Sequence, residues 1–114
     1  MPNLIICIFW AVMWASDDWL SFCAFERTEI IGKTLKTIQG PGTDIGVISQ
    51  IMDAVSQHGT ITAQLLNYTK HGVPFYHTIT VEPLVDSAGR TQIFRVHSKD
   101  IMSARDVIHN GLAT

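Results

Sequence analysis

The chain has 114 residues, of which 46% are apolar and 16% are charged, and its formal net charge is −2. This length fits one domain, and the apolar content excludes an intrinsically disordered chain. Its 8 Lys and Arg residues are scattered among 10 Asp and Glu residues, so we expect no nucleic-acid partner. Two cysteines without a CxxC motif indicate reduced thiols, and therefore an intracellular protein, with the cytoplasm and the nucleus not distinguished.

The first element is a run of twelve apolar residues from Leu4 to Ala15. A membrane span needs about 20 such residues. A signal peptide begins with a positively charged region, which Met1-Pro2-Asn3 lacks. Because isoleucine, valine and aromatic residues favour strands, we predict one or two buried strands here, in preference to a signal segment, and no membrane span. An exposed apolar strand in this run would favour dimerisation.

Helical signals follow this run. Ser16-Asp17-Asp18 predicts the start of a short helix through Cys23, and Thr28 to Gly32 predicts one further capped turn. Residues 33 to 42 are irregular and end in a turn sequence. Thr43 is expected to cap the longest helix, which Gly59 ends and which carries one apolar stripe, formed by Ile48, Ile51, Met52 and Val55.

From Thr60 the apolar residues recur with a period of two, which predicts three strands. Turn sequences at Lys70-His71-Gly72 and at 86–89 join them into an antiparallel meander. After Ser98 a weakly amphipathic pattern predicts a C-terminal helical extension over residues 99–114. The order of elements indicates an α+β fold, with a five-stranded antiparallel sheet and helices covering one face.

Three polar residues, Asn67, His77 and Ser98, fall on the apolar faces of the three predicted strands. A buried polar group without a partner costs about 1–3 kcal/mol, so these side chains either line a ligand pocket or satisfy one another. Both alternatives stay open at this point. No histidine pair has metal-ligand spacing and no motif confers catalytic geometry, so we expect neither a metal site nor an enzyme.

Several segments resemble the light-oxygen-voltage (LOV) branch of the PAS superfamily. They are Ala15-Ser16-Asp17-Asp18, Glu29 to Lys33, Gln39 to Asp44, and Leu65 to Tyr76. The match covers residues 14–98, and we therefore place a PAS/LOV-like domain at residues 1–98. The resemblance implies the PAS fold, a five-stranded antiparallel sheet with helices on one face, which agrees with the pattern of the residues.

The resemblance also implies how the site departs from the family. Flavin-binding members carry G-x-N-C-R-F-L-Q, whereas residues 32–39 read Gly-Lys-Thr-Leu-Lys-Thr-Ile-Gln. Leu35 stands where the photoreactive cysteine is expected, and Lys36 replaces an arginine that pairs with the flavin phosphate. Met52 takes the place of a second phosphate arginine. Of the expected ring contacts, Gln39 and Asn67 are kept, while His77 replaces an asparagine and Ser98 replaces a glutamine.

These differences predict a non-enzymatic PAS signalling module that cannot form a cysteinyl–flavin adduct. We expect no bound cofactor, and flavin mononucleotide (FMN) is the alternative. The module would act through a protein partner or a homodimer, using the outer face of the sheet and the terminal segments. The second hypothesis is a flavin-type small-molecule sensor, responsive to light or redox change without the adduct, with its ligand against Gln39, Asn67 and His77. Cys7 is expected to be structural, although a strand position beside the pocket would make it a substitute thiol.

Overall fold

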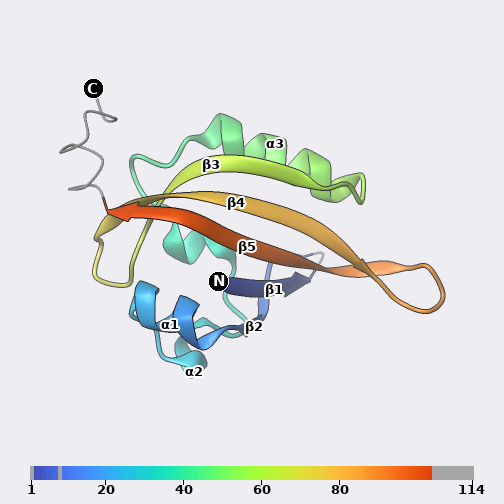
Figure 1. Ribbon diagram of the computed structural model, residues 1–114, viewed down its shortest axis with the longest axis horizontal. Helices are drawn as coiled ribbons and strands as arrows, with labels where there is room; N and C mark the ends of the chain where they lie inside the picture. The colour runs from blue at the N-terminus through green and yellow to red at the C-terminus, as the bar shows by residue number, and fades with distance from the viewer. Residues whose placement is uncertain (1, 8, 104–114) are drawn as a thin grey trace.

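The computed structural model describes residues 2–7 and 9–103 (Figure 1). Five strands form one antiparallel sheet in the order β2-β1-β5-β4-β3, which confirms the predicted α+β fold. The strands are β1 (Asn3–Cys7), β2 (Val12–Ala15), β3 (Ile61–Tyr68), β4 (Pro74–Val85) and β5 (Thr91–Ser103). Alternate residues of β1, β3, β4 and β5 are buried on one face, because successive side chains of a strand point to opposite sides.

The apolar N-terminal run forms two paired strands, as predicted, but the second is only partly buried, because Met13 and Trp14 are exposed. A tight turn joins them, in which the Trp10 N–H donates to the carbonyl of Cys7 at 2.9 Å. Trp10 adopts a left-handed backbone conformation with a φ of 68°. The outer edge of β2 is covered at its first residue, because Val12 exchanges backbone hydrogen bonds with Gly32 and Lys33 at 2.8 and 2.9 Å. This part of the edge is therefore closed to pairing with another strand.

The helices are α1 (Asp17–Cys23), α2 (Arg27–Ile30), the 3-10 helix η1 (Leu35–Ile38) and α3 (Ile45–Ser56). Three predicted helix ends were wrong by one or two residues. Glu26 caps α2 through a capping box with Glu29, so the cap is not Thr28. The Asp44 carboxylate caps α3. At the end of α3 the left-handed residue is His58, with a φ of 57°, one position before Gly59.

Thr43 is not a cap because its hydroxyl is used elsewhere. It donates to the carbonyl of Leu66 at 2.8 Å and accepts from the Gly40 N–H at 3.0 Å. These two bonds fasten the loop before α3 to the edge strand β3. The predicted stripe of α3 is confirmed at Ile51 and Val55, which are buried, whereas Met52 is 49% exposed.

The prediction of a helix from residue 99 was wrong over its first five residues, because β5 continues to Ser103. Lys99 pairs with Thr78 and Met102 pairs with Tyr76, with an irregularity in register between these pairs. Asp100 lies there with a φ of 51°. Backbone pairing with β4 thus outweighs the weak amphipathic pattern. The remainder of the predicted helix, residues 104–114, lies outside the described residues.

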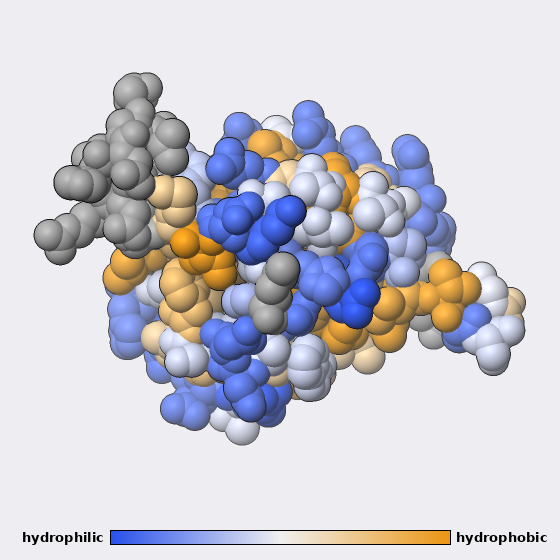
Figure 2. Space-filling view, in the orientation of Figure 1, coloured by the Kyte–Doolittle hydropathy of each residue, from blue (hydrophilic) through white to orange (hydrophobic). Residues whose placement is uncertain are grey.

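Both predicted turns of the meander are confirmed, at Lys70-His71-Gly72 and at Asp86 to Gly89. β4 and β5 extend past the rest of the sheet as a two-stranded ribbon, which is the protruding hairpin of Figure 1. Figure 2 shows both apolar and hydrophilic residues on the surface of this hairpin. Within the described ranges no helix is long and apolar enough to cross a membrane.

Candidate functional site

A cavity of about 390 Å³ lies between the buried face of the sheet and the helices. Its lining comes from β1, β3, β4 and β5 on one side, and from α1, η1 and α3 on the other. These helices therefore cover one face of the sheet, as predicted. Cavities that bind small molecules in proteins measure about 300–1,000 Å³, so this one is large enough for a ligand.

The three polar residues predicted to share a face are buried at the sheet side of this cavity and contact one another. His77 Nε2 lies 2.8 Å from the Asn67 amide, and His77 Nδ1 lies 3.0 Å from Ser98 Oγ. With the amide oriented to satisfy every neighbour, Asn67 accepts from His77 and donates to the carbonyls of Ile38 and Leu66. The three residues therefore satisfy one another, which is one of the two alternatives left open by the sequence, and they also line a cavity.

Burial controls the charge of His77. The side chain is 3% exposed, and its ring meets the ring of Phe75 edge-on at 4.9 Å. Desolvation lowers the pKa of His77 from 6.5 to about 4, because charging a ring that is cut off from water is unfavourable. His77 is therefore neutral at physiological pH and carries a single N–H.

The other predicted site residues lie on the helical side of the cavity. Leu35 and Lys36 belong to η1, Gln39 follows it, and Met52 is on α3, and all four line the cavity. Leu35 and Gln39 are half-buried, whereas Lys36 is exposed. The structure thus brings the complete predicted set around one cavity. The hydrogen-bonded residues Asn67, His77 and Ser98, which we call the polar chain, lie in the sheet, and Lys36 lies at the surface.

Neither Cys7 nor Cys23 is among the residues that line the cavity. Cys7 follows Ile6 on β1, and because Ile6 faces the core, Cys7 points to the opposite side of the sheet. Cys7 therefore does not face the cavity, which argues against the alternative of a substitute thiol. Cys23 is buried on α1, where desolvation raises the pKa of its thiol to about 12 and keeps it protonated.

Sequence reasoning missed part of the wall, because distant segments supply it. Trp10 and Phe9 come from the turn between β1 and β2, and Trp19 comes from α1. Leu4 and Val96 add neighbouring positions on β1 and β5. Their apolar character gave a signal for burial, but no local pattern showed that these residues would surround a space.

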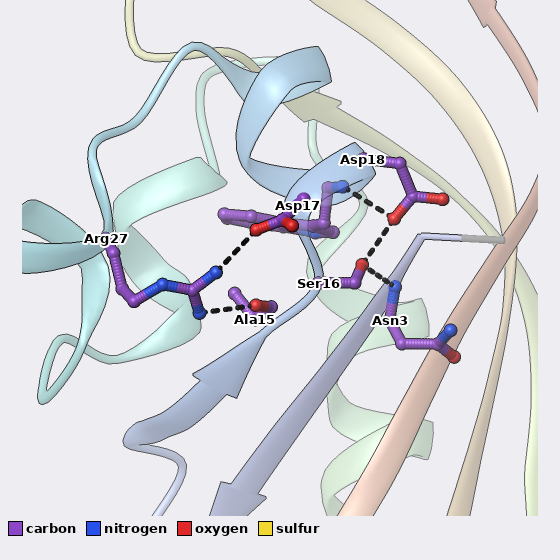
Figure 3. A network of polar contacts seen from close by, with 7 residues as sticks. Asn3, Ala15, Ser16, Asp17, Asp18 and Arg27 are labelled. Carbon is purple, nitrogen blue, oxygen red and sulfur yellow. Dashed lines mark hydrogen bonds and ion pairs between the residues drawn. The ribbon is translucent and has the colours of Figure 1, made fainter.

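A polar network joins the start of α1 to the strands β1 and β2 (Figure 3). The Asp18 carboxylate accepts from the Trp19 N–H at 2.9 Å and from the Ser16 hydroxyl. Ser16 Oγ in turn accepts from the Asn3 N–H at 2.8 Å, which ties the start of β1 to the start of α1. Nearby, Arg27 donates to the Ala15 carbonyl at 2.7 Å and forms an ion pair with Asp17. Figure 3 shows these contacts holding the first helix against the N-terminal strands.

The outer face of the sheet carries a charged cluster. Glu82 on β4 accepts from Arg95 Nε at 2.8 Å and lies 3.0 Å from His97 Nε2, both on β5. The hydrogen bonds from Arg95 and His97 lower the pKa of Glu82, although the cluster is partly exposed and contributes little to stability. Among the described residues, no group of three or more potential ligands could hold a metal ion.

The profile of the PAS domain family matches residues 5–103. The chain belongs to this family. Rice phototropin-2 is 37% identical over 83 residues, which cover 73% of this chain and 9% of that protein. A blue-light-activated histidine kinase of Brucella anthropi is 29% identical over 90 residues, which cover 79% of this chain and 18% of that protein.

A human voltage-gated inwardly rectifying potassium channel is 29% identical over 108 residues, which cover 93% of this chain and 10% of the channel. The PAS domain described here therefore spans less than a fifth of each of these relatives. Its fold matches the light-state structure of the Aureochrome1 LOV blue-light photoreceptor, with a TM-score of 0.80 and 24% identity over 86% of this chain and 79% of that one. The PAS fold is thus established, with LOV-like homology in sequence.

Proposed function

We propose that this PAS domain is a non-enzymatic, intracellular signalling module that acts by dimerisation or partner binding. The observation that carries the proposal is an apolar patch on the outer face of the sheet, next to Arg95 and Glu82. We call it the outer patch, and its residues are Ile5, Cys7, Trp14, Leu84 and Ile93, which share this face by strand pairing. Trp14 is 46% exposed there. Exposed apolar patches with aromatic residues mark interaction surfaces.

A homodimer is the first contact to test. Replacement of Trp14 by Lys places a charge inside the outer patch, and we expect the dimer dissociation constant to rise at least about tenfold in sedimentation velocity experiments. Ile45→Lys is the matched control, because Ile45 is 81% exposed at the start of α3 and lies outside the patch. A wild-type domain that stays monomeric at every concentration would contradict dimerisation, and equal effects of both variants would contradict this location.

We also propose that the domain cannot form a cysteinyl–flavin adduct. The proposal is supported by Leu35, which lines the cavity at the position where the LOV resemblance expects the reactive cysteine. Leucine has no thiol, and both cysteines of the chain are placed elsewhere. The Brucella kinase is blue-light-activated and Aureochrome1 is a blue-light photoreceptor, but we expect no light sensing through a cysteinyl–flavin adduct in this chain.

Leu35→Cys alone is expected not to create a photocycle. The thiol would reach the cavity, but the polar chain of Asn67, His77 and Ser98 and the exposed Lys36 would still hold FMN poorly. With FMN added in excess, blue light should cause no reversible loss of the blue flavin absorption band, as in the control Leu35→Ser. Reversible bleaching in the cysteine variant alone would show that the proposal is wrong.

The cavity favours a second candidate function, a small-molecule sensor without an adduct. Its volume and its enclosure by Trp10, Trp19 and the helices are typical of a binding pocket. A ligand there would contact β4, β5 and α3 together, so binding would bias the packing between the helices and the sheet.

A further inference from the structure

The cavity has mostly apolar walls and one polar part, formed by Asn67, His77 and Ser98, which we call the sheet end. These two parts offer a ligand different contacts. The walls are apolar and include Leu4, Trp19, Ile51, Leu65, Ile79 and Val96. Apolar cavities of only about 150 Å³ already bind molecules such as benzene. A space of about 390 Å³ with these walls is therefore suited to an apolar molecule of larger size.

At the sheet end every hydrogen of the polar chain is already donated to the protein. Ser98 has one hydroxyl hydrogen, neutral His77 has one ring N–H, and the Asn67 amide has two hydrogens. The Ser98 hydroxyl donates to His77 Nδ1, His77 Nε2–H donates to Asn67 Oδ1, and Asn67 Nδ2 donates to the carbonyls of Ile38 and Leu66 at 3.1 and 3.3 Å. Lone pairs remain for a ligand, but no hydrogen does.

Protonation does not supply a further hydrogen under ordinary conditions. His77 forms hydrogen bonds with Asn67 and Ser98 and packs against the ring of Phe75, and all three neighbours are uncharged. Burial holds the pKa of His77 near 4, so its second nitrogen stays an acceptor for Ser98. The sheet end therefore keeps its acceptor character through the physiological pH range.

An isoalloxazine ring does not match this end of the cavity. The pyrimidine edge of a flavin presents two carbonyl oxygens, which need hydrogen-bond donors when they are buried. Each unpaired acceptor costs about 1–3 kcal/mol. Lys36 is the one cation among the described lining residues, and it is exposed, so it holds a phosphate only weakly.

We propose that this cavity binds a neutral, mostly apolar small molecule in preference to FMN, with any polar atom of the ligand turned to Gln39 and Lys36 at the mouth. This inference rests on the sensor candidate above and names its ligand class. Such a ligand would pack against the apolar walls. It would need no hydrogen-bond donor from Asn67, His77 or Ser98, whose hydrogens are all donated within the protein.

N-phenyl-1-naphthylamine is a suitable probe, because it is neutral, apolar and more fluorescent when shielded from water. We expect saturable binding to the purified domain, at least about tenfold tighter than FMN or lumiflavin. Quenching of tryptophan emission should accompany it in a Trp14→Phe background, because Trp10 and Trp19 line the cavity. Equal or tighter binding of FMN would overturn the inference.

Two variants fix the location of the probe. Val96→Phe fills the cavity and should weaken probe binding at least about tenfold, whereas Val85→Phe makes the same change on the exposed end of β4 and should have no effect. Leu35→Trp at the half-buried wall gives a second block if Val96→Phe fails to fold. Unchanged probe binding in a folded blocking variant would contradict the inference.

His77→Asn tests the role of hydrogen-bond donors. The new amide adds a donor and releases Ser98, so lumiflavin affinity should rise about tenfold while affinity for the probe changes little. No rise in a folded variant would contradict the donor argument. If neither probe nor flavin binds, the sensor candidate fails together with the inference. If only flavin binds, the inference fails and the sensor candidate stands.

Discussion

The free energy of unfolding is expected to fall by roughly 3 kcal/mol as the pH decreases from 6.5 to about 4, because of His77. In this range the unfolded chain binds a proton at His77 that the folded domain does not bind. The stabilisation is therefore complete above pH 6.5 and is lost progressively as the pH falls towards the folded pKa. Urea unfolding at a series of pH values measures the slope.

His77→Asn is the matched variant, since it keeps a polar side chain and removes the titrating group. We expect its stability to change less across this range, and the difference between the two proteins isolates His77. Carboxylates with lowered pKa values, such as Glu82, also destabilise the fold at acid pH, but they are present in both proteins and cancel. Parallel pH profiles of the two proteins would show that His77 is not desolvated as described.

Gly40→Ala is expected to destabilise the domain by about 3 kcal/mol. A Cβ at Gly40 would lie 2.3 Å from Cε1 of Tyr68, so the ring must move. Moving it also breaks the bond that the Gly42 N–H donates to the Tyr68 hydroxyl at 2.8 Å. Overpacking costs about 1–3 kcal/mol and a lost hydrogen bond about 1 kcal/mol, and chemical denaturation measures their sum.

A double-mutant cycle separates this clash from a general effect of alanine. In a Tyr68→Ala background the ring is absent, so Gly40→Ala should add less than about 0.5 kcal/mol. Gly59→Ala provides a second control, because its new Cβ would meet the carbonyl of Ala54 at an ordinary contact distance of 3.4 Å. A full loss of stability in the Tyr68→Ala background would mean that the ring is not the cause.

The buried polar chain was predictable because period-two patterning places residues on a face without any knowledge of the fold. Asn67, His77 and Ser98 were assigned in this way to apolar faces, and strand pairing then set His77 opposite Leu65 and Ser98 opposite Ile79. The pattern could not decide between a ligand pocket and mutual hydrogen bonding. Mutual hydrogen bonding depends on the distances between side chains on three strands, and a local sequence pattern does not determine these distances.

Helix ends and the end of β5 were harder to predict, because competing partners decide them. Thr43 is a good cap by residue type, but its hydroxyl is taken by the Leu66 carbonyl of a strand more than twenty residues away. Asp44 caps the helix in its place. Similarly, Lys99 to Ser103 have a weak helical pattern, yet β4 offers them backbone partners. Tertiary pairing outweighs local propensity in both cases.

The order of the sheet has a consequence for synthesis on the ribosome. β1 is made first, but it lies between β2 and β5, and Asn3 pairs with His97. A nascent chain that ends before β5 can form the β1–β2 and β3–β4 hairpins, but not the strand that joins them. The apolar face of β1 must therefore wait for nearly the whole domain to be translated, and such distant pairing makes folding slow. During this interval the apolar residues of β1 are most exposed to aggregation and most dependent on chaperones.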